Sequence, residues 1–202
     1  MVPKAAVFDL GKVLVDFDYG IAVSRIQTAC QITPQALRQL IDQSPLLLRY
    51  EIGQLTTEQF FAEVKTAAGF RGDFDTFQEM FGDIFTPIAP MVQLQAAIRA
   101  RGLPTYILSN TNELAVHDIR RRHPFFQNFD GYVLSYEHGA MKPDARLYAV
   151  AERLTGLKGK DLLYLDDRPE NVAGAATRGW RAILHESPEK TRAAVQKFGL
   201  LD

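Results

Sequence analysis

The stretch Ala5-Ala6-Val7-Phe8-Asp9-Leu10-Gly11 decides the expected fold. It is an apolar run of strand type that ends on a carboxylate, with a glycine two positions later. A carboxylate inside an apolar run is costly to bury unless another group pairs with it. We therefore expect residues 4–10 to form a buried strand, and other parts of the chain to bring polar groups to Asp9.

Three later stretches repeat this pattern of an apolar strand that ends in polar residues, at 105–110, 132–135 and 162–167. A further strand is expected at 181–184, and helix-spaced apolar residues fill the segments between these strands. Strands that alternate with helices of this length are typical of right-handed βαβ units and of a mostly parallel sheet. The predicted fold class is therefore α/β, with a doubly wound, mostly parallel, Rossmann-like sheet.

One block of the chain breaks the alternation, because residues 19–85 give helix signals and no convincing strand. The helix signals are N-caps at Thr33 and Asp73 and a capping box formed by Thr56 and Gln59. We expect an inserted α-helical domain at 18–86, with the sheet domain formed by 1–17 and 87–202. The segment 11–18 is expected to be a short loop or a hairpin.

The composition excludes several classes of protein. The chain has 202 residues, of which 47% are hydrophobic, and this predicts a globular fold. Its 23 basic and 24 acidic residues almost balance, so no nucleic acid or anionic membrane is expected as a partner. The chain lacks an apolar run of about 18 residues, so no transmembrane helix is expected. The single cysteine, Cys30, excludes an intrachain disulfide and favours a reducing, cytoplasmic compartment. Oligomeric state is not predicted.

Polar residues should gather at one edge of the predicted sheet. In parallel sheets the carboxyl ends of the strands share an edge, where ligands bind. That edge would hold Asp9, the pair 109–110 and the acidic pair Asp166-Asp167, with Lys142 in a loop nearby. Three adjacent carboxylates repel one another unless a cation neutralises them, and an all-oxygen cluster suits Mg²⁺ that is shared with a phosphate.

These groups suggest a reaction. Ser109 and the amide of Asn110 would hold phosphate oxygens, and Lys142 would neutralise them. Asp9 would attack phosphorus and form an aspartyl-phosphate that water later hydrolyses. Taken singly, each of these residues also fits a turn, a helix cap or a surface position, so the argument depends on their combination.

The motifs resemble those of the haloacid dehalogenase-like hydrolases, in order and in spacing. The matching segments are Val7-Phe8-Asp9-Leu10-Gly11, Leu108-Ser109-Asn110, Lys142-Pro143, and Leu165-Asp166-Asp167 with Asn171. The resemblance implies a Mg²⁺-dependent phosphomonoesterase for a small phosphorylated metabolite, with a sugar phosphate as the expected substrate. It implies that the helical insert is a cap. The implied roles are nucleophile (Asp9), substrate binding (Ser109, Asn110, Lys142) and metal binding (Asp9, Gly11, Asp166, Asp167).

Gly11 departs from the family pattern. The family's phosphatases usually carry an aspartate there, whose carbonyl binds Mg²⁺ and whose side chain protonates the leaving group. Glycine keeps the carbonyl and loses the acid. The stretch 9–16 is most similar to bacterial sugar-1-phosphate phosphatases, which also have this glycine and whose leaving group needs protonation less. Asp16 or Asp18 is a possible substitute acid, although both fit solvated loop residues better.

Other functions remain open. A phospho-acceptor switch uses similar residues, but its acid pair comes first in the chain, whereas Asp166-Asp167 comes last here. A second alternative is a relative that only binds its ligand, because it lost its activity when it lost the acid at position 11. A dehalogenase that attacks carbon is a third, and it would not need the acidic pair. The stretch 49–53 is expected to be a loop between helices that either contacts substrate or forms a surface turn.

Overall fold

The central feature of the computed structural model, which describes residues 2–42 and 44–201, is a five-stranded sheet with the order β5-β4-β1-β6-β7. All its strand pairs are parallel. The strands are β1 (Ala5–Phe8), β4 (Thr105–Ser109), β5 (Gly131–Leu134), β6 (Leu162–Asp166) and β7 (Arg181–Leu184). The predicted α/β fold with a doubly wound parallel sheet is confirmed.

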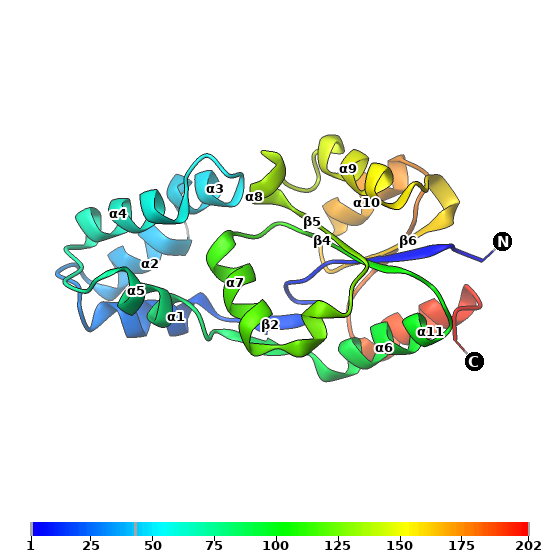
Figure 1. Ribbon diagram of the computed structural model, residues 1–202, viewed down its shortest axis with the longest axis horizontal. Helices are drawn as coiled ribbons and strands as arrows, with labels where there is room; N and C mark the ends of the chain where they lie inside the picture. Colours follow the sequence, from blue (N-terminus) through cyan, green and yellow to red (C-terminus); the bar gives the residue numbers. More distant parts are fainter. Residues whose placement is uncertain (1, 43, 202) are drawn as a thin grey trace.

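Helices cover both faces of this sheet (Figure 1). One face packs under α9 (Ala145–Thr155) and α10 (Pro169–Thr177), and the other under α6 (Ala89–Ala100), α7 (Glu113–Arg122) and α11 (Pro188–Lys197). Successive side chains of β1 alternate between the two apolar cores: Ala5 and Val7 belong to one, Ala6 and Phe8 to the other. Burial on both faces explains why the strand reads as a continuous apolar run.

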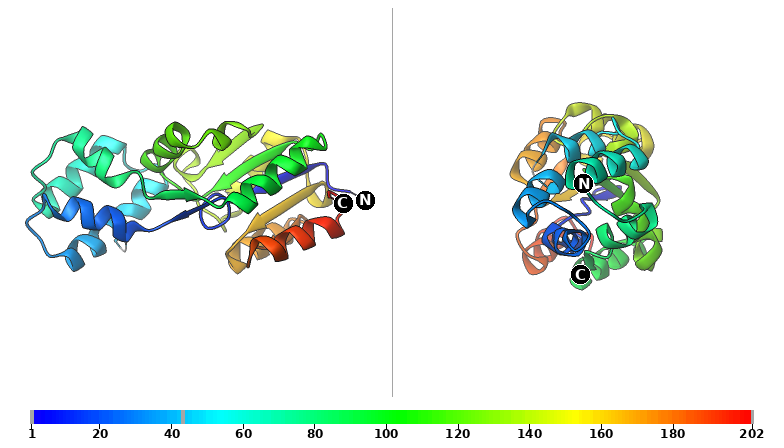
Figure 2. Two further views of the ribbon diagram at one scale, coloured as in Figure 1. Left: turned by 90° about the horizontal axis from the view of Figure 1, so that it is seen from below. Right: turned by 90° about the vertical axis from the view of Figure 1, so that its left-hand side faces the viewer.

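The block that interrupts the alternation forms a group of helices beyond the carboxyl ends of the strands (Figure 2). It contains α1 (Tyr19–Gln27), α2 (Pro34–Asp42), α3 (Pro45–Glu51), α4 (Thr57–Ala68) and α5 (Phe74–Phe81). The predicted caps are confirmed at Thr33, Thr56 and Asp73. Aromatic rings form much of its interior, where Tyr50 stacks on Phe60 with ring centroids 4.4 Å apart.

A short antiparallel pair connects this helical group to the sheet. It consists of β2 (Val15–Phe17) and β3 (Phe85–Pro87), with Phe17 opposite Phe85. The sequence predicted helices and no strand over residues 19–85, so it missed β3, which begins at Phe85. A strand of three residues is too short to show a period of two, and its proline carries no N–H.

The stretch 49–53 also differs from its prediction as a loop. Its first three residues form the last turn of α3, and the turn begins only at Ile52. Ser44 caps this helix, and Pro45 occupies its first position. The remaining short elements are α8 (Ser135–His138) and two 3₁₀ turns, Pro124–Gln127 and Gly159–Asp161. Within 2–42 and 44–201, no helix has the length and apolar character needed to cross a membrane.

Candidate active site

Asp9 lies directly after the central strand β1 and is only 7% exposed. Its backbone N–H donates to the carbonyl of Leu165 on β6 at 2.8 Å, which continues the sheet pairing by one residue. One carboxylate oxygen accepts a hydrogen bond from the N–H of Leu10 at 2.6 Å. Burial raises the pKa of Asp9 to about 7, although the ammonium group of Lys142 acts in the opposite direction.

Lys142 connects the ends of three strands through its ammonium group. Its Nζ lies 2.8 Å from Oδ1 of Asp9 and 2.7 Å from Oδ2 of Asp166, and it donates to the carbonyl of Leu108 at 2.9 Å. These contacts use all three donors of the ammonium, and the side chain is 1% exposed. Two further hydrogen bonds join its backbone to the side chain of Asn110, at 2.7 and 3.0 Å. The lysine is therefore held rigidly between the two buried carboxylates.

The two members of the acidic pair have different surroundings. Asp166 is fully buried and accepts hydrogen bonds from Lys142, from the hydroxyl of Tyr164, from Asn171 and from the backbone of Arg168. Burial acts to raise the pKa of Asp166, but Lys142 holds it below its ordinary value. Asp167 is half-buried, and its pKa is raised by burial and by the neighbouring charge of Asp166.

The sheet edge brings three carboxylates together as predicted. Asp9, Asp166 and Asp167 each offer an oxygen atom, and these atoms all lie within 4.8 Å of one another. Lys142 lies between two members of this group, with its Nζ 2.8 Å from Asp9 and 2.7 Å from Asp166. Burial is the main reason why the pKa values of Asp9 and Asp167 are raised, and the neighbouring charge of Asp166 adds to it. Hard carboxylate oxygens in this arrangement fit a magnesium ion.

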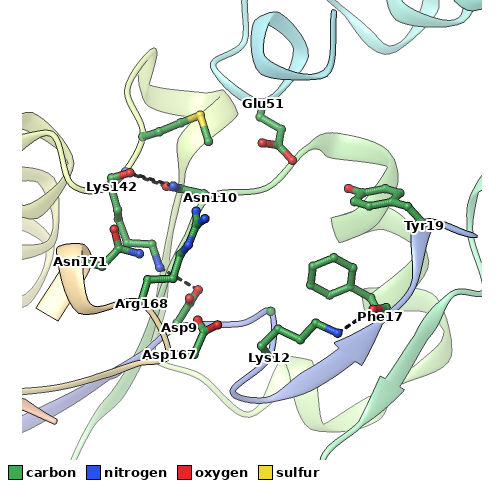
Figure 3. A pocket seen from close by; sticks show the side chains of 12 residues that line it. Asp9, Lys12, Phe17, Tyr19, Glu51, Asn110, Lys142, Asp167, Arg168 and Asn171 are labelled. Atoms are coloured by element: carbon green, nitrogen blue, oxygen red, sulfur yellow. Dashed lines mark hydrogen bonds and ion pairs between the residues drawn. The ribbon is translucent and has the colours of Figure 1, made fainter. Parts of the chain in front are cut away.

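A cavity of about 440 Å³ opens above the carboxylates (Figure 3). Asp9, Asn110, Lys142 and Asp167 line it from the sheet side. On the other side it is closed by four residues that the sequence did not identify individually: Lys12, Phe17, Tyr19 and Glu51. Arg168 also lines it, at the start of α10.

Ser109 lies at the end of β4, beside the main cavity. It is almost fully buried, donates a hydrogen bond to the carbonyl of Asn110 at 3.3 Å, and lines a smaller adjoining cavity of about 70 Å³. Gly11, Phe17 and Glu51 belong to the walls of both cavities, so the two spaces are neighbours. Ser109 is therefore next to the main cavity, and Asn110 is the residue of this pair that reaches it.

An aromatic ring takes the space beside Gly11. A Cβ atom at this position would lie 2.9 Å from Cε1 of Phe17. Asp16, considered as a substitute acid, is 64% exposed and pairs with Lys12, which lowers its pKa. Asp18 accepts a hydrogen bond from Gly20 and caps α1. Neither carboxylate lines the cavity, and both are exposed to solvent, as the sequence favoured.

A buried lysine between strand-end carboxylates, on a parallel sheet with a helical insert, defines the class of protein. The model of the haloacid dehalogenase-like hydrolases matches residues 3–179, and the chain belongs to this family of enzymes.

Its relatives include both phosphatases and dehalogenases. The chain is 26% identical over 178 residues to the sesquiterpene phosphatase astK of Aspergillus oryzae, covering 87% of this chain and 86% of the relative. It is 24% identical over 192 residues to an (S)-2-haloacid dehalogenase of Pseudomonas fluorescens, covering 88% and 82%. The fold matches that of a HAD family enzyme of Bacteroides thetaiotaomicron, solved with magnesium and inorganic phosphate. The TM-score is 0.79 at 19% identity, over 90% of this chain and 93% of that one.

Proposed function

We propose that this hydrolase is a Mg²⁺-dependent phosphomonoesterase that acts on a small phosphorylated metabolite through an aspartyl-phosphate on Asp9. The observation that carries this proposal is the cluster of three carboxylate oxygens within 4.8 Å of one another. A dehalogenase that attacks carbon has no need of a metal and gains nothing from this costly arrangement. The magnesium and phosphate bound by the structural neighbour from Bacteroides are consistent with the proposal.

In this proposal the metal ligands are Asp9, the backbone carbonyl of Gly11, Asp166 and Asp167. A bound Mg²⁺ would neutralise the carboxylates and polarise the phosphoryl group. Asp9 attacks phosphorus with one carboxylate oxygen, and the bond from phosphorus to the leaving oxygen breaks with its electron pair. The leaving oxygen takes a proton from solvent. Water then attacks the phosphorus of the aspartyl-phosphate, the bond from phosphorus to the Asp9 oxygen breaks, and the water's proton passes to solvent as the Asp9 carboxylate and inorganic phosphate are released.

Lys142 is proposed to act twice in this reaction. Its ammonium keeps part of the Asp9 population ionised near neutral pH, since it opposes the effect of burial. It also neutralises the phosphate oxygens that Ser109 and the amide of Asn110, at the end of β4, hold by hydrogen bonds. Asp166, Tyr164 and Asn171 keep the lysine in place by their hydrogen bonds around the buried carboxylate.

We also propose that residues 18–86 act as a cap over the site, with the catalytic core formed by 1–17 and 87–202. The pair β2 and β3 would then be the connection between core and cap. A cavity of about 440 Å³ has the size of a small-metabolite site, which suits a sugar phosphate such as the sugar 1-phosphate suggested by the stretch 9–16. A cytoplasmic location belongs to the same proposal.

The test is hydrolysis of p-nitrophenyl phosphate by the wild-type protein and by Asp9→Asn, with Mg²⁺ and with excess chelator. We expect turnover only in the wild type with Mg²⁺, and trapping by beryllium fluoride only when Asp9 is present. Full activity in chelator would refute the metal assignment. Release of halide from a 2-haloacid without phosphatase activity would make the protein a dehalogenase, and phosphate binding without turnover would make it a binding protein.

A further inference from the structure

The smaller cavity, of about 70 Å³, is a space to which the proposed reaction assigns no ligand. It shares five wall residues with the larger cavity, and four of them are labelled in Figure 3: Phe17, Tyr19, Glu51 and Asn110. The fifth is Gly11, which brings no side chain into the shared space. Because Asn110 is proposed to hold the phosphate, the smaller cavity adjoins the phosphate position. Only a group close to the phosphoester bond would reach it.

The remaining walls of the smaller cavity are mainly apolar. They come from the loop after β1, from the pair β2 and β3, and from α7, and their apolar side chains are Leu10, Val15, Phe85, Ala115 and Ile119. Each of these residues is at most 9% exposed. Such a space holds water poorly, because an ordered water molecule needs about two to four polar partners. The apolar walls therefore favour an organic group over solvent.

Thr111 adds a polar group to this space. It is 7% exposed, and it lines the smaller cavity but not the larger one. Its backbone is fixed by the side chain of Ser135, whose hydroxyl accepts from the N–H of Thr111 at 2.9 Å and donates to its carbonyl at 3.0 Å. The hydroxyl of Thr111 can donate a hydrogen bond to a carbonyl oxygen. The smaller cavity therefore suits a group that combines an apolar part with a carbonyl.

The volume limits the size of that group. A cavity of about 150 Å³ with apolar walls holds benzene, so about 70 Å³ corresponds to roughly three or four non-hydrogen atoms. An acetamido group has this size, with a methyl group for the apolar walls and a carbonyl oxygen for the hydroxyl. In a 2-acetamido sugar 1-phosphate, the group is attached to the carbon next to the one that bears the phosphate. This short separation matches a cavity that adjoins Asn110.

We infer that the smaller cavity is the subsite for an acetamido group, and that the substrate is a 2-acetamido sugar 1-phosphate. This inference rests on the proposed phosphatase function and adds the class of sugar to it. Thr111 binds the carbonyl oxygen of the acetamido group. Ala115 and Ile119, one turn apart on α7, determine the size of the group that fits.

The test compares N-acetylglucosamine 1-phosphate with glucose 1-phosphate, two substrates that differ only at carbon 2 of the sugar. Both substituents are uncharged, so the comparison does not depend on the charged groups around the cavities. We expect the wild type with Mg²⁺ to prefer the acetamido substrate in kcat/KM by about tenfold, from the burial of one methyl group and one added hydrogen bond. Thr111→Val, which keeps the shape and loses the hydroxyl, should reduce this preference by about threefold.

Variants of α7 test the size of the subsite. Ala115→Val adds two methyl groups to the wall and should abolish the preference while glucose 1-phosphate is still hydrolysed. Ala151→Val is the matched control, since it makes the same change at a buried position of α9, on the other face of the sheet, and should keep the preference. Ile119→Val removes one methyl group and should extend activity to N-propanoylglucosamine 1-phosphate, which is one carbon longer. This smaller change decides the question if Ala115→Val does not fold.

The outcomes separate this inference from the proposed function. If p-nitrophenyl phosphate is not hydrolysed with Mg²⁺, the proposed function itself fails. If it is hydrolysed but the wild type shows no preference for N-acetylglucosamine 1-phosphate, only the subsite is wrong. A preference that Ala115→Val keeps as fully as Ala151→Val would also overturn the subsite, because the acetamido group would then bind elsewhere. A preference for glucosamine 1-phosphate over both sugars would show that an ammonium is bound, and would overturn the assignment as well.

Discussion

Replacing Asp9 by asparagine should stabilise the metal-free protein at pH 8 while it abolishes turnover. Asp9 is 7% exposed, and burial raises the pKa of its carboxyl group to about 7. At pH 8 the folded protein must therefore carry a buried negative charge that Lys142, already shared with Asp166, offsets in part. Asparagine has nearly the same shape, keeps an oxygen that can accept from Lys142, and carries no charge.

The magnitude follows from the two pKa values. A change of the pKa from 3.8 in the unfolded chain to about 7 in the folded protein corresponds to about 4 kcal/mol at pH 8, at about 1.4 kcal/mol for each pKa unit. Because the folded-state pKa is the higher one, the neutral carboxyl contributes its full stability below about pH 4. This contribution is lost as the pH rises through about 7. The loss of an ionic partner for Lys142 makes 4 kcal/mol an upper limit, and we expect a gain of about 1–3 kcal/mol.

The assay is urea unfolding in excess chelator at several pH values from 5 to 8.5. The stability of Asp9→Asn relative to the wild type should increase with pH and level off above about 7.5. Mg²⁺ should stabilise the wild type much more than the variant, because the variant lacks a ligand. Asp16→Asn is the control, since this carboxylate is 64% exposed and its pKa is lowered. An Asp9→Asn protein that is less stable than the wild type at pH 8, or a difference independent of pH, would refute the reasoning.

Two further variants and one kinetic series test the rest of the site. Asp167→Asn should weaken Mg²⁺ binding by about tenfold or more, measured by calorimetry, with little effect on metal-free stability. Asp166→Asn should instead lower the free energy of unfolding by about 3 kcal/mol, because this fully buried carboxylate holds Lys142 in place. Equal effects of Asp167→Asn and Asp166→Asn on metal-free stability would contradict the roles assigned to the two residues. Gly11→Asp alone should not restore an acid, since Phe17 occupies the space, and only the double variant with Phe17→Ala should speed hydrolysis of alkyl phosphates. Across aryl and alkyl phosphates, log(kcat/KM) should fall steeply as leaving-group pKa rises, because a missing general acid is worth about 10²–10⁴-fold; a flat plot would mean that another group supplies the proton.

The sheet edge could be predicted because the apolar strands and the polar residues at their ends are local patterns in the sequence. The residues Asp9, Asp166 and Asp167 each follow an apolar run, and parallel pairing alone is enough to bring such strand ends together. The position of Lys142 follows from the same topology, since its loop leads into the helix after β5. What the sequence could not predict is that the lysine is shared between two buried carboxylates, because that depends on side-chain packing.

The opposite wall of the cavity could not be predicted for a different reason. The residues Tyr19 and Glu51 belong to helices whose position over the sheet depends on contacts far apart in the sequence. One example is the bond from Leu114 to Tyr50, which spans 64 residues. The sequence predicts the stretch 49–53 as a loop that either contacts substrate or forms a surface turn, but its helical end and the packing of Gly53 against Tyr136 are visible only in three dimensions. Contacts of this kind leave no periodic signal in the chain.

Gly11 and Phe17 have to be considered as one unit. A side chain at position 11 and the ring of Phe17 cannot occupy the same space, so the absence of the acid and the presence of the aromatic wall are physically coupled. The ring also packs against Tyr19, which lies on the same side of the cavity as Glu51. In the proposed phosphatase, this apolar surface would contact the leaving group at the position where the sequence comparison with the family led us to expect a proton donor. The leaving group would then have to depart without a proton from the protein, and the proposed sugar 1-phosphate meets that requirement.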